Sequence, residues 1–184
     1  MPFKKYPDIE RLGHEDNQDI LNYGEDTLVI EEKVDGGNFS IWLEEDGLIH
    51  FGSRNRDLTI GNDDKIFARL QIQLREHLSN LENEGIKLNP DYIYYLECMQ
   101  PHTIKYNNPP NFIGFDIRMK RDINSSEDFG LFLGRDMRVQ EFIRLKIPSV
   151  PLIWRGSVKE FKKIEVNSLI GESKIENWNG RLEL

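Results

Sequence analysis

A strand-like run that contains a lysine and leads into a glycine-rich turn constrains this chain more than any other feature. Residues 27–34 are rich in β-branched side chains and are typical of a strand, yet Lys33 lies within them. The sequence Asp35-Gly36-Gly37 is a strong turn signal. Apolar residues then alternate from 38 to 44, which predicts a return strand. We therefore expect a hairpin with one ammonium group close to its turn.

Short apolar strands and amphipathic helices alternate along the rest of the chain. The expected strands are 48–52, 92–96, 112–117 and 150–154, and the expected helices are 62–84, 136–146 and one that begins after Ser157. Pro151 restricts the last strand to a sheet edge, and Glu160 has the spacing of a capping box with Ser157. Because sequences typical of hairpins are frequent, the predicted fold class is α+β with mainly antiparallel sheets and flanking helices.

The length and composition favour a single domain over residues 1–184 with a sizeable core. No apolar run approaches the roughly 20 residues that a membrane helix needs. Residues 1–5 are not followed by the apolar segment of a secretory signal. Cys98 is the only cysteine, which excludes an internal disulfide framework and a multi-cysteine zinc site. These features favour a reducing, cytoplasmic location.

The net charge of -8 argues mildly against a protein whose whole surface binds polyanions. It does not exclude a local basic groove, because net charge says nothing about how charges are distributed. A nucleic-acid enzyme with this charge is expected to bind its polymer weakly or through a partner.

Lys33 has two interpretations from the residues alone. It can be a solvated lysine on a surface hairpin, or it can be a nucleophile. A nucleophilic lysine needs a lowered pKa, which desolvation or a neighbouring cation provides. The glycines of the following turn allow the backbone to approach a ligand closely, because glycine has no Cβ. The four-residue pattern K-x-D-G recurs by chance and does not decide between these interpretations.

Four motifs in order along the chain resemble the covalent nucleotidyltransferases, the superfamily of ATP-dependent DNA and RNA ligases and mRNA capping enzymes. Residues 32–36 resemble the K-x-D-G motif, and Asn38-Phe39-Ser40 is similar to its form in RNA-repair ligases. Residues 53–57 resemble the S-R-x motif, residues 92–97 a strand that ends in glutamate, and residues 112–117 an aromatic F-D-I motif. Each motif alone is weak, but the set is specific and covers residues 1 to about 155.

The resemblance implies a ligase-type adenylation domain that uses ATP and Mg²⁺. Lys33 would attack the α-phosphate of ATP and form a lysyl-AMP intermediate, while Mg²⁺ neutralises the phosphates. Arg54 would bind the phosphate or sugar through its guanidinium fork. Glu97 would accept a hydrogen bond from the ribose or help to place the metal, and Phe115 would stack on adenine.

The resemblance assigns lesser roles around the same turn. Glu32 would read the adenine amino group, and Asn38 would organise the phosphates or the nick end. Asp35 and Gly36 would lie against the nucleotide. Asp116 is expected to order the local backbone rather than to touch substrate.

The predicted function is an ATP-dependent RNA ligase of RNA repair, which transfers AMP to a 5′-phosphate and then joins it to a 3′-hydroxyl. RNA ends are preferred over DNA ends because of Asn38-Phe39-Ser40 and the F-D-I motif, and an ATP-dependent DNA ligase is the second enzymatic interpretation. Capping guanylyltransfer ranks lower. An NAD-dependent ligase is not expected, since nothing upstream provides a nicotinamide-binding domain.

Two later motifs of the family, an E-G-h-V strand and a K-x-K strand, are not found. Glu183 could be the first residue of E-G-h-V. Loss of donors that stabilise phosphate charge in the transition state commonly costs orders of magnitude in rate. The chain is therefore expected to be truncated or split, degenerate, or completed by a partner chain. The alternative function is a nucleotide-binding remnant or regulatory protein without catalysis.

Overall fold

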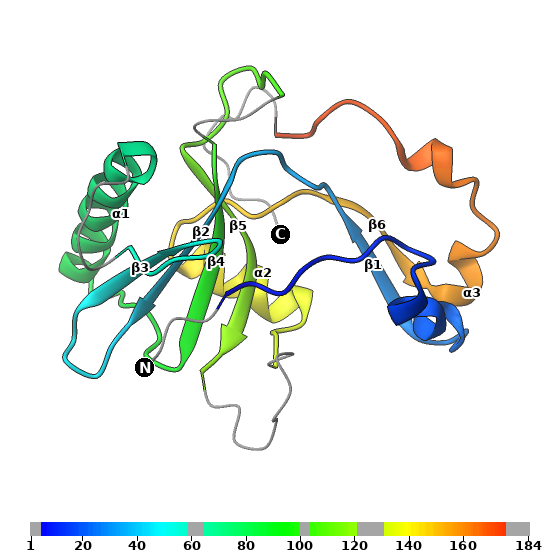
Figure 1. The fold of residues 1–184 in the computed structure, drawn as a ribbon, viewed down its shortest axis with the longest axis horizontal. Coiled ribbons are helices and arrows are strands. Elements are labelled where there is room, and N and C mark those ends of the chain that lie inside the picture. Colours follow the sequence, from blue (N-terminus) through cyan, green and yellow to red (C-terminus); the bar gives the residue numbers. More distant parts are fainter. Residues whose placement is uncertain (1–4, 59–64, 100–103, 121–130, 176–184) are drawn as a thin grey trace.

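The computed structural model describes residues 5–58, 65–99, 104–120 and 131–175, which form two antiparallel sheets (Figure 1). The strands are β1 Thr27–Glu31, β2 Gly37–Leu43, β3 Ile49–Ser53, β4 Tyr92–Cys98, β5 Phe112–Met119 and β6 Leu152–Ser157. The helices are α1 Lys65–Asn83, α2 Arg135–Arg144 and α3 Val158–Phe161, with 3-10 helices η1 Glu15–Leu21 and η2 Val166–Leu169. Within the described ranges, no helix has the length and apolar character needed to cross a membrane.

The larger sheet has the strand order β3-β2-β4-β5, and it shares one core with α1 and α2. Tyr94 and Leu96 of β4 point into this core, as do Phe39 and Ile41 of β2. The helix α1 contributes a buried stripe at helical spacing, made of Phe67, Leu70, Leu74, Leu78 and Leu81. Because successive side chains on a strand alternate between its faces, Glu97 points to the face opposite this core.

The helix α2 packs closely against β5 at a glycine. A Cβ atom on Gly114 would lie 2.5 Å from the ring of Phe142, so only glycine fits there without displacing the helix. The amide of Gly114 also donates to the carbonyl of Pro148 at 2.7 Å, and the amide of Val150 donates to the carbonyl of Gly114 at 2.9 Å. The helix is therefore fixed against the middle of β5 on the core side.

The structure confirms the predicted fold class and most of the predicted elements. The long helix runs over Lys65–Asn83 and ends before Gly85, whose φ of +79° suits glycine; residues 62–64 of the prediction lie outside the described residues. The capping box is present, since the Ser157 hydroxyl accepts from the Glu160 amide and the Glu160 carboxylate accepts from the Ser157 amide.

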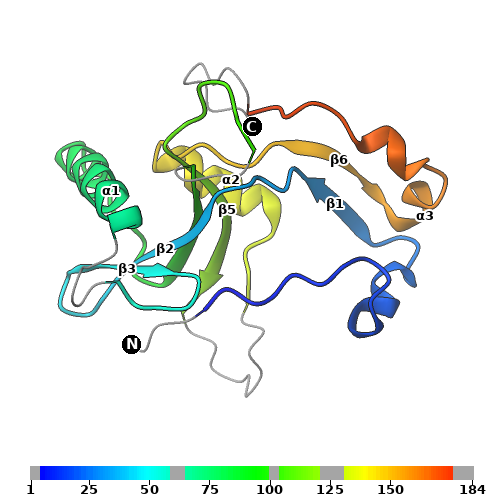
Figure 2. The ribbon, with the colours of Figure 1, turned by 45° about the horizontal axis from the view of Figure 1, so that its top comes forward.

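The prediction of a hairpin around the glycine-rich turn is wrong. Strand β1 ends at Glu31 and pairs with β6, whereas β2 begins at Gly37 and pairs with β3 and β4. The β1–β6 ladder stops because Pro151, which precedes β6, has no N–H to donate; its carbonyl accepts from the Glu32 amide at 3.0 Å. Residues 32–36 therefore pass from one sheet to the other (Figure 2).

Truncation of the buried stripe on α1 tests the core. Leu74 is fully buried, so we expect Leu74→Ala to lower the free energy of unfolding by about 2–5 kcal/mol, through lost transfer energy and a residual cavity. Ile72 is 60% exposed on the same helix, and Ile72→Ala should change that free energy by no more than about 0.5 kcal/mol. Urea unfolding followed by circular dichroism measures both, and equal losses would contradict this assignment of the core face.

Candidate active site

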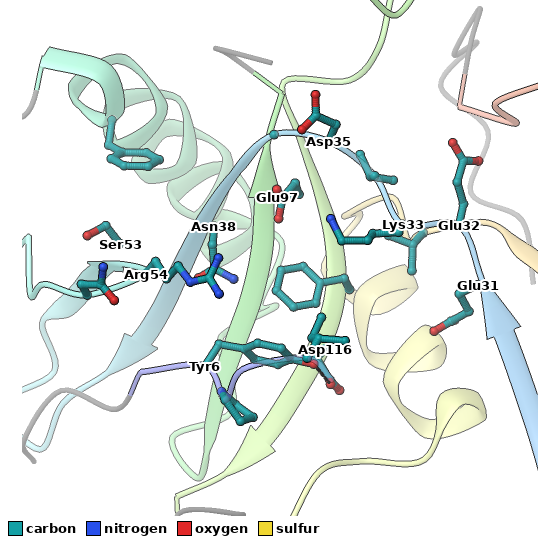
Figure 3. A pocket seen from close by; sticks show the side chains of 18 of the residues that line it. Tyr6, Glu31, Glu32, Lys33, Asp35, Asn38, Ser53, Arg54, Glu97 and Asp116 are labelled. Carbon is teal, nitrogen blue, oxygen red and sulfur yellow. Dashed lines mark hydrogen bonds between the residues drawn. The ribbon is translucent and has the colours of Figure 1, made fainter. Parts of the chain in front are cut away.

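Residues 32–36, which cross from one sheet to the other, are called the crossing segment below. A cavity of about 910 Å³ lies where this segment meets the four-stranded sheet (Figure 3). Its walls come from the N-terminal arm, the end of β1, residues 32–36, the turn after β3, strands β2, β4 and β5, and helices α1 and α2. All eight residues that the sequence analysis placed in the site line it: Glu32, Lys33, Asp35, Gly36, Asn38, Arg54, Glu97 and Phe115. A cavity of this size suits a ligand as large as a nucleotide.

Lys33 lies in the middle of the crossing segment rather than within a strand. Its side chain is exposed and extends into the cavity with the amine toward Glu97 (Figure 3). The segment has no strand partner there because it is changing sheets, which is why the ammonium can enter the cavity instead of disrupting a core.

Gly36 fixes the crossing segment to β4. A Cβ atom at Gly36 would lie 2.3 Å from the carbonyl oxygen of Cys98 and 2.8 Å from Cγ of Glu97. No other residue fits this approach without moving the backbone. The Gly36 amide also hydrogen-bonds to the Glu97 carboxylate, so the segment that bears Lys33 and the strand that bears Glu97 are directly joined.

Glu97, on the wall of the cavity formed by β4, has a strongly raised pKa. Burial raises the pKa of its carboxyl from 4.5 to about 7, although the Gly36 amide and the positive charges of Lys33 and Arg54 act in the opposite direction. The carboxylate of Asp35 adds to the upward shift in pKa. A carboxyl that titrates near neutral pH in a cavity, facing an amine, is typical of a functional site.

Two carboxylates of the crossing segment, those of Glu32 and Asp35, accept hydrogen bonds from other segments of the same chain rather than pointing at Lys33. Asp35 accepts a hydrogen bond from the Ile104 amide at 2.8 Å, and its own amide donates to the Tyr106 hydroxyl at 2.8 Å. Glu32 accepts from the Ser173 hydroxyl and, at 2.9 Å, from the Lys174 amide. These contacts order both ends of the crossing segment.

Arg54 and Asn38 lie on the side of the cavity formed by β2 and β3. Arg54 follows β3 and pairs with Asp8 of the N-terminal arm at 2.9 Å, with both side chains more than half exposed. Asn38 lies directly opposite Glu97 in the β2–β4 ladder. The two residues therefore lie near Glu97 in the cavity, and the roles assigned to them in nucleotide binding stay predictions.

Phe115 is shared between the cavity and the protein interior. It lines the cavity and packs edge-on against Tyr6, with ring centroids 5.0 Å apart. It also lies 6.3 Å from the ring of Tyr95, which is buried. The ring is therefore held in place by aromatic neighbours while part of it borders the cavity.

The sequence analysis missed a polar network next to Phe115, centred on Arg138 and Asp116. Arg138 of α2 contacts Glu31, Asp116 and the carbonyl of Phe115, and the Tyr6 hydroxyl donates to Asp116 at 2.9 Å. Asp116 also accepts from the Ile117 amide at 3.0 Å, consistent with the expected backbone role. The signal for Arg138 was its position four residues before Phe142, on the buried side of the helix.

Comparisons with known proteins give a match to one family model and several solved structures of similar fold. A model of the RNA ligase family matches residues 26–181. An archaeal ATP-dependent RNA ligase has a similar structure, with a TM-score of 0.59 and 20% identity over 88% of this chain and 40% of that protein. A Naegleria gruberi RNA ligase variant without ligand gives a TM-score of 0.60 and 17% identity over 95% and 49% of the two chains.

A second Naegleria gruberi variant, solved with ATP and manganese, gives a TM-score of 0.56 and 16% identity over 85% of this chain and 46% of that one. The chain thus spans less than half the length of these three structures. Among curated proteins, none matches the chain.

The raised pKa of Glu97 predicts a pH-dependent effect on stability. Between pH 4.5 and about 7 the folded protein retains a proton that unfolded Glu97 has lost, so this group lowers the free energy of unfolding as pH rises through that window. Glu97→Gln should therefore be more stable relative to the unmodified protein at pH 8 than at pH 5. Urea unfolding at both pH values measures the difference.

Glu76→Gln, on the exposed side of α1, is the matched control and should show the same change in stability at both pH values. A Glu97→Gln effect that does not depend on pH would contradict the upward shift in the pKa of Glu97.

Proposed function

Since this chain belongs to the RNA ligase family, we propose that it activates RNA ends with ATP through a covalent AMP on Lys33. The observation that carries this proposal is the convergence of Lys33, Glu97, Arg54 and Phe115 on one cavity, although they come from four separate parts of the chain. An amine, a carboxyl, a guanidinium and an aromatic ring are the groups that adenylyl transfer from a nucleotide needs.

In the first step, the neutral amine of Lys33 attacks the α-phosphorus of ATP. An N–P bond forms, the bond from phosphorus to the bridging oxygen breaks, and pyrophosphate leaves while the nitrogen loses a proton. The position of the amine inside the cavity, opposite Glu97, supports this role (Figure 3). Arg54 would bind phosphate oxygens with its guanidinium fork.

We assign the nucleoside part of ATP to the wall of the cavity that includes Phe115. Phe115 would stack on adenine, which aromatic rings do with a gain of about 1–3 kcal/mol per base. Glu97 would accept from a ribose hydroxyl, Glu32 would lie near the adenine amino group, and Asn38 would contact the phosphates or the RNA end. The crossing segment around Asp35 and Gly36 would approach the nucleotide through its backbone.

The cavity also suits one divalent cation held mainly by the nucleotide. No group of three or more His, Cys, Asp or Glu side chains that could hold a metal occurs among the described residues. Mg²⁺ in nucleotide sites binds one or two carboxylates together with phosphate oxygens and water. A single protein carboxylate, that of Glu97, is therefore enough for this role. When bound, the cation would neutralise phosphate charge.

In the later steps, AMP passes from Lys33 to a 5′-phosphate, and a 3′-hydroxyl then displaces AMP to form the new phosphodiester bond. RNA is the proposed substrate because the family model that matches the chain is that of RNA ligases. The similar archaeal enzyme is described as ATP-dependent, which supports ATP as the nucleotide. We propose the cytoplasm as the location.

Replacement of Lys33 tests the covalent intermediate. With ATP labelled at the α-phosphate and Mg²⁺, we expect label on the protein, detected after denaturing electrophoresis. Lys33→Ala should abolish it because the N–P bond cannot form. Lys159→Ala, an exposed lysine on α3, should retain it.

Label that persists on Lys33→Ala would contradict the assignment. An unlabelled protein that still binds ATP would support a nucleotide-binding remnant instead of a ligase. Incubation of the labelled protein with nicked RNA and nicked DNA duplexes then separates the two substrates, and transfer to DNA alone would overturn the choice of RNA.

Replacement of Phe115 tests the adenine wall. Phe115→Leu should weaken ATP binding by about 1–3 kcal/mol, through loss of stacking on the base. Phe112→Leu is the matched control, because Phe112 lies on the same strand but packs against the core and does not line the cavity. Calorimetric titration with ATP measures both variants, and equal losses of affinity would contradict the stacking role.

A further inference from the structure

Arg138 is a buried cation that joins three parts of the chain. Its side chain is 9% exposed, and one guanidinium nitrogen lies 2.5 Å from both carboxylate oxygens of Glu31. The other terminal nitrogen donates to the carbonyl oxygen of Phe115 at 2.5 Å and lies 3.6 Å from a carboxylate oxygen of Asp116. Within the part of the chain that the structure describes, the partners of this side chain belong to β1 and β5.

These contacts join the two sheets at the cavity. Glu31 is the last residue of β1, two residues before Lys33, and Phe115 lies in the middle of β5. Among the described strands, β1 pairs with β6 alone, so no ladder hydrogen bond links it to β5. The guanidinium is therefore a direct polar connection between the strand that leads to the amine and the peptide that carries the aromatic ring.

We propose that Arg138 is a positioning residue that sets the Lys33 amine relative to the ring of Phe115, and hence to the α-phosphate of a nucleotide stacked on that ring. This inference rests on the proposed function, and it adds to it a residue that touches neither reacting atom. Its helix supplies the rigidity, because α2 is packed against Gly114 in the same strand.

The geometry requires arginine rather than any cation. A guanidinium has donors in a fixed plane and can bind a carboxylate and a carbonyl oxygen at once, whereas an ammonium is a single point of charge. Buried ion pairs are often no more stabilising than a packed apolar side chain, so stability alone gives a weak reason for this one. The defined placement of Glu31 and Phe115 gives a stronger reason.

The test compares Arg138→Met, Arg138→Lys and Glu31→Gln with a matched arginine of the same helix. Arg144 also binds a carboxylate with two nitrogens, that of Glu141, but it does not line the cavity. Arg144→Met should therefore lower stability without changing chemistry. Single-turnover labelling with α-labelled ATP gives the rate at saturating ATP and the apparent KM for each variant.

We expect Arg138→Met to lower the rate at saturating ATP by about a hundredfold, as misplacement of reacting groups by about 1 Å can do, with a smaller change in KM. Glu31→Gln should act in the same direction, and Arg138→Lys should recover part of the rate. Arg138→Lys also serves if Arg138→Met does not fold. Rates equal to those of Arg144→Met would overturn the proposal.

A second measurement does not depend on ligase activity. With 4-fluorophenylalanine at position 115, the fluorine NMR signal should shift or broaden in Arg138→Met and Arg138→Lys and stay unchanged in Arg144→Met. If the protein takes no label but the signal responds as expected, the proposed function fails and the positioning role stands. An unchanged signal in both Arg138 variants would overturn the positioning role by itself.

Discussion

The close contact between Gly36 and β4 is the constraint on which the rest of the site depends. The chain leaves one sheet at Glu31 and enters the other at Gly37, and between them it must pass over the end of β4. It can do so at this distance only because Gly36 has no Cβ to meet the Cys98 carbonyl. The hydrogen bond from the Gly36 amide to Glu97 then places Lys33, three residues earlier, across the cavity from that carboxylate.

Two ionisable groups that line the cavity, Arg138 and Glu97, differ in how their charges are compensated. Arg138 has acceptors on two sides and acts as a fixed connection between strands. Glu97 has one backbone donor and nearby positive charges that do not offset its burial, so the pKa of its carboxyl rises to about 7. In the proposed reaction, a cation on the ATP phosphates would favour the ionised form of Glu97. Arg138 therefore holds neighbouring strands in a fixed arrangement, whereas the ionisation of Glu97 would change when the proposed ligand binds.

Local patterns in the sequence predicted most elements of this fold but not their connections. The capping box at Ser157 and the stop at Gly85 depend on a few adjacent residues, and both are present in the structure. The supposed hairpin around Gly36 failed because a β-branched run followed by glycines does not reveal its strand partner. That choice depends on residues more than a hundred positions away, in β6 and in the proline that precedes it and ends the ladder.

The site residues were predictable where they lie within contiguous motifs and not where they act through the fold. Lys33, Glu97 and Phe115 each stand in a short recognisable pattern, and the fold brings them together. Arg138 stands in no such pattern, since its importance depends on packing between α2 and β5. A buried charge on an amphipathic helix is visible in a sequence only as an interruption of its apolar side.

In the proposed function, the pairing of Arg54 with Asp8 lets an acidic chain present a cation to a phosphate of ATP. Both side chains are more than half exposed, and an ion pair of this kind contributes little to stability. Exchange of the Asp8 carboxylate for a phosphate oxygen therefore costs little and keeps a charge-assisted hydrogen bond on the guanidinium. The same carboxylate limits non-specific attraction of polyanions to Arg54, in keeping with a net charge of -8. Selectivity for a phosphate held in the cavity then follows from the groups that position it, rather than from a broad positive surface.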